Sequence, residues 1–183
     1  MTAHPTTLGY ALLGLLHQGP RSGYDLRKVF ATTALGNYSS SPGAIYPALA
    51  RLERAKLIDG RVDQARSLRP RMLYQPTKAG SAAMRRWLTQ PISHEDVERR
   101  IDELMLRFAF LWILEDRRRT ERFLVELAEQ VDAYVTELKR QRSLHPPETP
   151  IQPRLALEAG IEQYQACARW ARKALIAVRK ERT

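Results

Sequence analysis

The first half of the chain alternates short apolar runs with polar turns. Leu8–Leu16 is almost wholly apolar and is followed by Gly19-Pro20, which indicates a buried helix with a sharp end. Ser22 can cap a second helix, in which apolar and basic positions alternate up to Phe30. A third helix begins at Ser41, because serine accepts hydrogen bonds from free N–H groups and the following proline has no N–H to satisfy. Its inward stripe recurs at Ile45, Leu49 and Leu52.

Two β-prone runs come next, at residues 60–64 and 71–75, and an arginine-rich loop separates them. This pattern predicts a β-hairpin. Thr77–Gly80 then begins another helix, which carries Met84 and Trp87 on its apolar side. The order of three helices, two strands and a further helix is that of a winged helix-turn-helix, with the two strands as the wing.

The second half of the chain has the spacing of long helices. Apolar residues from Val97 to Trp112 recur in steps of three and four, which predicts one amphipathic helix, and a second such helix runs to about Arg142. Four prolines between residues 146 and 153 interrupt the pattern. The predicted fold is therefore mainly α, with a winged helix-turn-helix followed by an all-α region. The last segment has coiled-coil spacing at Leu157, Ile161, Tyr164, Ala168, Ala171, Leu175 and Val178.

Charge and glycine content divide the chain at one place. Residues 1–91 hold 13 Lys and Arg against 4 Asp and Glu, a net charge of +9, whereas residues 92–183 hold 17 against 16, a net charge of +1. Eight of the nine glycines lie in the first part. Pro91 can stop a helix and Ser93 can cap the next one. We therefore expect one domain at residues 1–91 and a second at residues 92–183.

The positive charge of the first domain favours a negatively charged binding partner. An excess of this size on one domain is typical of a protein that binds nucleic acid. Charge alone leaves two alternatives open. One is a basic surface without a polyanionic partner, and the other is a non-catalytic interaction module whose basic domain docks on an acidic protein.

The order of elements favours double-stranded DNA. A recognition helix presents its first residues to base edges in the major groove, while positive side chains anchor phosphates. Ser41 and Gly43, at the start of the third helix, would hold a phosphate through free N–H groups. Tyr46 and Arg51 would approach base edges. Contacts to the DNA backbone are expected from Arg66, Arg69, Arg71 and Lys78.

Four motifs in this half resemble those of PadR-type transcriptional regulators. They are Gly23-Tyr24-Asp25-Leu26, the run from Ser41 to Glu53, Leu57-Ile58, and the run from Tyr74 to Gly80. The resemblance implies a dimeric winged-helix repressor that binds inverted-repeat operators. In the family, the counterparts of five residues lie on or near the DNA-facing helices: Tyr24, Ser41, Gly43, Tyr46 and Pro47.

Two positions depart from the family pattern. Pro76 stands where an aliphatic residue is usual, and we expect it to shorten the second wing strand. Tyr38 stands where many relatives carry tryptophan, near a region where some bind ligands. The resemblance also implies release from DNA by a small aromatic effector, such as a phenolic acid, between the two domains. The candidate ligand-binding residues are Tyr38, Phe108 and Trp112.

The resemblance further implies that the C-terminal helices form a homodimer. The seven coiled-coil positions of the last segment would then contact a second chain. A dimer suits the proposed partner, because two half-sites lie about 34–36 Å apart, one turn of DNA, and require two recognition helices. The spacing also fits packing within one chain, so this alternative stays open.

The sequence gives no support for a metal site, a phosphate-binding loop or a hydrolase active site. The four histidines show no metal-ligand spacing, Cys167 is the single cysteine, and the chain has no glycine-rich phosphate loop and no hydrolase motif. We therefore expect no enzyme, no metal and no cofactor. The chain lacks a run of about 18 apolar residues, so we expect a soluble cytoplasmic protein without a membrane partner.

Overall fold

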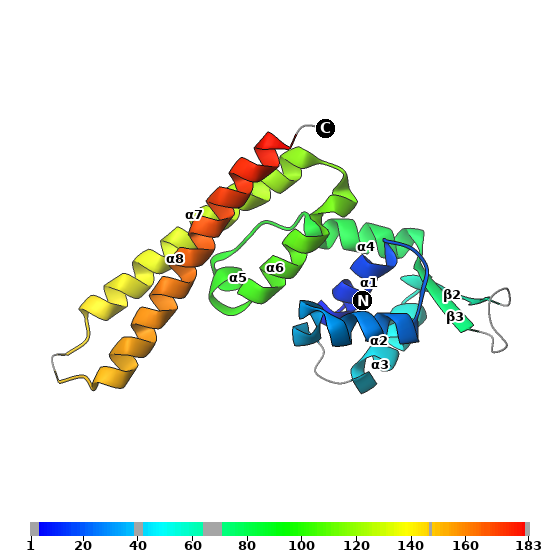
Figure 1. The fold of residues 1–183 in the computed structure, drawn as a ribbon, viewed down its shortest axis with the longest axis horizontal. Coiled ribbons are helices and arrows are strands. Elements are labelled where there is room, and N and C mark those ends of the chain that lie inside the picture. Colours follow the sequence, from blue (N-terminus) through cyan, green and yellow to red (C-terminus); the bar gives the residue numbers. More distant parts are fainter. Residues whose placement is uncertain (1–3, 39–41, 64–70, 147, 182–183) are drawn as a thin grey trace. The chain divides into compact units, whose positions relative to one another are not determined.

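Residues 4–38, 42–63, 71–146 and 148–181 are described by a computed structural model (Figure 1). The chain divides into residues 1–88, here unit 1, and residues 89–183, here unit 2. The division falls just before Pro91, where the sequence analysis placed the domain boundary. Within the described ranges, no helix is long and apolar enough to cross a membrane.

Unit 1 is assembled around its first helix, which is buried from Gly9 to Leu16. Tyr10 stacks on Trp87 with ring centroids 4.4 Å apart and planes 4° from parallel, which joins the first helix to the last. The predicted inward stripe of the third helix is confirmed, because Ile45, Leu49 and Leu52 are all buried. The helices of the unit are α1 (Thr7–Leu16), α2 (Gly23–Thr32), the 3-10 helix η1 (Ala34–Tyr38), α3 (Pro42–Arg54) and α4 (Lys78–Leu88).

The sheet of unit 1 contains one strand more than the predicted wing. The strands β1 (Arg21–Ser22), β2 (Ile58–Asp63) and β3 (Arg71–Pro76) form an antiparallel sheet in the order β1-β3-β2. The expected shortening of the second wing strand is wrong, because Pro76 is the last residue of β3 and lies opposite Ile58. Proline is tolerated at this position because β1 pairs only with residues 73 and 74, so β3 has one neighbour at its end.

The start of α4 is fitted tightly to the loop that follows α3. Thr77 caps α4, since its Oγ1 accepts a hydrogen bond from Gly80 N at 3.1 Å. The same hydroxyl donates to Lys56 O at 2.7 Å, and Thr77 N donates to Leu57 O at 3.0 Å. Lys56 has a positive φ of 58°, which turns the chain from α3 into β2. The wing and α4 are thus held to the end of α3.

Unit 2 is entirely helical. Its longest helices, α7 and α8, form an antiparallel hairpin in which the two helices lie side by side (Figure 1). Pro153 is accommodated in the first turn of α8, where its missing N–H would have no partner within the helix. The helices are α5 (His94–Arg99), α6 (Ile101–Phe110), the 3-10 helix η2 (Leu111–Leu114), α7 (Arg117–Ser143) and α8 (Ile151–Lys180).

The prediction of a single helix from Val97 to Trp112 is wrong, because the helix is interrupted at Arg100. Ser93 caps α5 in a capping box with Asp96, as the sequence indicated. Arg100 then leaves the helical region with φ −139° and ψ 32°, and its guanidinium pairs with Asp96 at 2.8 Å. Two short helices replace one long helix, and the first of them, α5, packs against α7.

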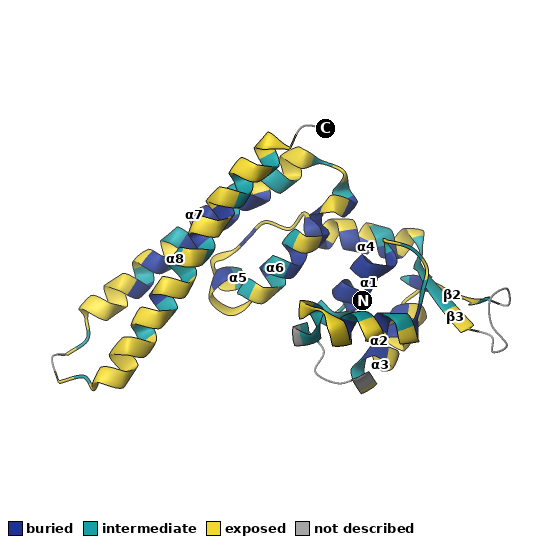
Figure 2. Ribbon diagram, in the orientation of Figure 1, coloured by how far each residue is buried: buried dark blue, intermediate teal, exposed yellow. Residues whose placement is uncertain are grey.

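The seven coiled-coil positions on α8 are inaccessible or half-covered within one chain. Ile161, Ala168 and Ala171 are buried, and the other four are half-buried. Figure 2 shows the buried stripes of α7 and α8 along the line where the two helices meet. Tyr164 also donates a hydrogen bond to Val97 O at 3.2 Å. This seam therefore packs against the same chain, the alternative that the spacing left open.

Candidate nucleic-acid interface

The N-terminus of α2 is fixed by its own cap and by the sheet. Ser22 Oγ accepts from Asp25 N at 3.2 Å, and Ser22 N and Oγ donate to Asp25 Oδ2 at 3.2 and 2.6 Å. The Ser22 hydroxyl holds the pKa of Asp25 below its ordinary value, with smaller contributions from Arg71 and Arg21. Arg21 and Ser22 form β1, which pairs with Tyr74 and Leu73 of β3. The first turn of α2 is therefore joined to the base of the wing.

This arrangement brings residues from four elements around one open cavity of about 440 Å³. Tyr24 comes from α2, Tyr46 from α3 and Arg71 from β3, three of the residues predicted to contact DNA. Tyr24 is 56% exposed and Tyr46 is 51% exposed, so both phenol rings are accessible. The cavity is also lined by Ser22, Gly23, Met72 and Tyr74.

Gly23 sets the position of Tyr46. A Cβ atom at Gly23 would lie 2.7 Å from Tyr46 Cε1, closer than real Cβ contacts allow. The absence of a side chain at this position therefore lets the Tyr46 ring lie against the start of α2. Arg27 places its guanidinium 5.3 Å from the centre of the Tyr24 ring, which adds a cation close to the other phenol.

The base of the cavity is less exposed than its rim. Tyr74 is half-buried, and burial together with the charge of Glu53 raises the pKa of its phenol above the ordinary value. Tyr74 is therefore a neutral hydroxyl near neutral pH, able to donate and accept hydrogen bonds. The cavity thus combines hydroxyl groups, aromatic faces and the cationic Arg71, a set that suits phosphate oxygens and base edges.

The remaining predicted DNA contacts are distributed more widely. Gly43, Pro47 and Arg51 are exposed on α3, and Lys78 is exposed at the first position of α4. Arg51 lines a different, small cavity of about 100 Å³ next to the start of α1, so the structure does not bring it to Tyr24 and Arg71. Three predicted residues lie outside the described residues: Ser41, Arg66 and Arg69.

Two family models match the chain, one in each unit. Residues 12–86 match the transcriptional regulator PadR-like family, and residues 102–179 match the virulence activator alpha C-terminal family. Residues 12–86 are therefore similar to PadR-like transcriptional regulators. The description of this family model is that of a transcriptional regulator, the class of protein that the sequence analysis expected.

The chain is similar to a transcriptional regulator of Bacillus subtilis. It is 30% identical over 117 residues to the negative transcriptional regulator PadR of strain 168, and the match spans 63% of each chain, less than two thirds of that regulator. Its structure is similar to that of B. subtilis PadR in complex with operator DNA, at 26% identity and a TM-score of 0.43, covering 94% of this chain and 99% of the other. The complex of B. subtilis PadR with p-coumaric acid has 24% identity and a TM-score of 0.41, covering 96% and 97%.

Sequence reasoning missed the residues that complete the cavity. Gly23 and Tyr74 were included in the family motifs but were given no role. Ser22 was identified only as a helix cap, although the same residue pairs with β3. Met72, which is 43% exposed, carries no signal of its own because an outward residue on a hairpin has many uses.

The three predicted ligand-binding aromatic residues do not all lie in the same unit. Tyr38 is half-buried at the end of η1 in unit 1. In unit 2, Phe108 is half-buried and meets Trp170 edge-on, with ring centroids 5.1 Å apart. Trp112 lies on η2 and is 48% exposed.

Proposed function

We propose that the chain is a sequence-specific transcriptional repressor that binds an inverted-repeat operator as a homodimer. Residues 1–91 form its DNA-binding domain and residues 92–183 its dimerisation domain. The observation that carries this proposal is the convergence of Tyr24, Tyr46 and Arg71 on one open surface of a domain with a net charge of +9. Repression is supported by the 30% identity to a negative regulator.

The proposed contacts divide into two classes. Tyr46 and Arg51, on the exposed face of α3, read base edges in the major groove. Gly43 lies at the start of α3 and, with Ser41, holds a phosphate at the positive end of the helix. The wing and the start of α4 contact the DNA backbone through Arg66, Arg69, Arg71 and Lys78, and Tyr24 and Pro47 complete the surface.

Two variants are expected to weaken DNA binding in different ways. Tyr46→Ala should weaken operator binding by about 1–3 kcal/mol while leaving binding to a scrambled duplex nearly unchanged, because it removes a base contact. Arg71→Met should weaken both duplexes alike and reduce the slope of log K against log salt by about 0.9, because one phosphate contact is lost. Fluorescence anisotropy at several salt concentrations, with the DNA upstream of its own gene, measures both.

Arg140→Met is the matched control for net charge. Arg140 is exposed on α7 and pairs with Glu137 at 2.8 Å, far along the sequence from the DNA-binding domain. It should leave both affinities and the salt slope unchanged. Equal, salt-sensitive binding of the wild-type chain to operator and scrambled duplexes would defeat the proposal of sequence-specific recognition. Binding to neither would favour an acidic protein as the partner of the basic domain.

The proposed dimer requires a face other than the seam that packs on α7. Ile176 on α8 remains 54% exposed, and an exposed apolar side chain is stabilised when another surface covers it. We therefore assign the contact with the second chain to this side of α8. The seven coiled-coil positions act indirectly, by holding α8 against α7.

Ile176→Glu is expected to shift the chain from dimer to monomer, because it introduces a charge that would have to be buried in the interface. Sedimentation velocity over a range of concentrations measures the shift, and we expect at least a tenfold rise in the dissociation constant. Leu144→Glu is the control, since Leu144 is 67% exposed at the end of α7 and away from this side of α8. If both variants remain dimeric, the interface lies elsewhere.

Release of DNA by a small aromatic effector completes the proposal. The exposed indole of Trp112 provides a face for stacking, and Phe108 and Trp170 provide an aromatic surface in the same unit. Such an effector must bind the DNA-bound and free states with different affinities. A set of phenolic acids that changes neither the Tm nor the DNA affinity would contradict this part.

A further inference from the structure

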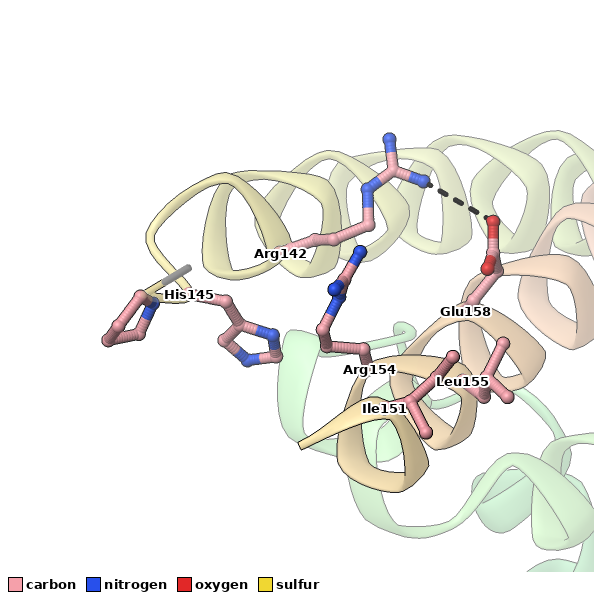
Figure 3. A pocket seen from close by; sticks show the side chains of 7 residues that line it. Arg142, His145, Ile151, Arg154, Leu155 and Glu158 are labelled. Carbon is pink, nitrogen blue, oxygen red and sulfur yellow. Dashed lines mark ion pairs between the residues drawn. The ribbon is translucent and has the colours of Figure 1, made fainter. Parts of the chain in front are cut away.

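The turn that joins α7 to α8 contains a cavity that the proposed function does not use. Its volume is about 470 Å³, larger than a hydrated inorganic ion requires and close to the lower range of small-molecule sites. Figure 3 shows the side chains around it. They come from the end of α7, the turn and the first turns of α8: Arg142, His145, Pro146, Ile151, Arg154, Leu155 and Glu158.

Positive groups exceed negative groups around this cavity. Arg142 and Arg154 extend their guanidinium groups toward the same region, as Figure 3 shows, and Glu158 is the one carboxylate among the lining residues. Arg142 Nη1 lies 4.0 Å from Glu158 Oε1, at the outer limit of an ion pair. Arg154 has no ion-pair partner within the described part of the chain. One carboxylate, distant from Arg142, is present for two guanidinium groups, so a further anion would be stabilised between them.

The imidazole of His145 adds a second polar group on the same side. Its Nδ1 atom is buried and has no hydrogen-bond partner among the residues that the structure describes. A buried nitrogen without a partner is costly, and an oxygen atom of a ligand would satisfy it. The first residues of α8 also lie at the cavity, so the positive end of the helix dipole contributes to the potential there.

The opposite wall of the cavity is apolar and accessible. Ile151 is 60% exposed and Leu155 is 54% exposed, one helical turn apart on α8, and Pro146 faces them from the turn. An anion without carbon atoms would leave these side chains in water. A ligand that carries an apolar body beside its negative group would cover them and gain the corresponding hydrophobic stabilisation.

This cavity is distinct from the aromatic residues assigned to the proposed effector. Phe123, which packs near Phe108, and Arg142 are both on α7 and are nineteen residues apart. At a rise of about 1.5 Å per residue, they lie roughly 28 Å apart along the helix. One small ligand cannot contact both places.

We propose that the α7–α8 turn is a binding site for a small organic carboxylate with an apolar body. The carboxylate lies between Arg154 and Arg142 with an oxygen toward His145, and the body covers Ile151 and Leu155. Arg154 is the principal anchor, because its guanidinium has no competing ion pair, and Glu158 turns away from the ligand toward Arg142. This site neither depends on DNA binding nor tests it.

Isothermal titration calorimetry with hexanoate on the full chain tests the proposal. We expect one site with a Kd of about 0.1–1 mM, as for a small ligand with one charged anchor. Hexanamide, which has the same shape without the charge, and acetate, which has the charge without the body, should each bind at least about tenfold more weakly. Inorganic phosphate should also bind more weakly, because it covers no apolar surface.

Arg154→Met should weaken hexanoate binding at least about tenfold while keeping the helical content of the chain. Arg140→Met is the matched control, because Arg140 is two residues from Arg142 but is paired with Glu137 and does not line the cavity. Equal weakening by both variants would reduce the site to general surface charge and overturn the proposal. Absence of hexanoate binding, or phosphate binding as tight as hexanoate, would overturn it as well.

Discussion

Replacing Gly80 by alanine is expected to destabilise unit 1 by about 3 kcal/mol or more. A Cβ atom at Gly80 would lie 1.9 Å from the backbone oxygen of Leu57, and this neighbour is main chain rather than a flexible side chain. The Leu57 oxygen cannot withdraw easily, because it accepts a hydrogen bond from Thr77 N. The methyl group would therefore push α4 away from the loop after α3 and break the Thr77 cap. Urea denaturation followed by circular dichroism measures the loss.

Gly160→Ala provides the matched control for this substitution. Gly160 lies inside α8, and no atom lies within 4 Å of a Cβ built there. Alanine should stabilise α8 by up to about 1 kcal/mol, because it has the higher helix propensity. The same chemical change therefore has opposite signs in the two units. A Gly80→Ala protein as stable as the wild type would show that α4 does not need its close approach to Leu57.

Replacing Arg107 by methionine is expected to destabilise unit 2 by about 2–4 kcal/mol. Arg107 is only 3% exposed, and its guanidinium donates a hydrogen bond to Gln90 O in the segment before α5. It also lies 5.4 Å from the centre of the Phe123 ring. Burial lowers the pKa of Arg107, whereas the nearby carboxylates raise it, so the charge is retained by its neighbours. Methionine fills the space but leaves Gln90 O without the hydrogen bond from Arg107.

The Arg107→Lys variant tests the contribution of the charge separately from that of the planar guanidinium. Arg107→Lys keeps the charge but loses the planar guanidinium that lies near Phe123. We therefore expect the stability of unit 2 to fall by about half as much as in Arg107→Met. Arg118→Met, exposed on α7, should be neutral within about 0.5 kcal/mol. Denaturation of all three variants in urea gives the comparison. If methionine is as stable as arginine, the buried charge contributes nothing to stability.

The sequence predicted most of unit 1 because its signals are local. The cap at Ser22, the inward stripe of α3 and the hairpin each depend on residues close together in the chain. The third strand could not be predicted in this way, since Arg21 and Ser22 are two residues without periodicity and are recognised only by pairing with β3. The cavity was missed for the same reason, because it needs four elements in place at once.

In unit 2, the sequence pattern left other features of the fold unpredicted. Coiled-coil spacing on α8 identifies a face that is buried but not the helix that covers it, and α7 of the same chain covers Ile161, Ala168 and Ala171. The break at Arg100 was also missed, because its side chain and neighbours are compatible with a continuous helix. The packing of α5 on α7 favours the break and is tertiary, whereas the ion pair of Arg100 with Asp96 joins residues one helical turn apart.

The pairing of β1 with β3 has a consequence for how operator preference can change. Tyr24 lies two residues after the end of β1, and Arg71 begins the strand to which β1 is paired, so the two residues move together. The conformational entropy of these two residues is lost when the domain folds, so DNA binding does not have to order them again. This favours a DNA-binding surface that is rigid before it meets DNA. A substitution at the base of the wing would displace the start of α2 as well. Changes that retarget the protein to another operator should therefore occur in pairs across this junction.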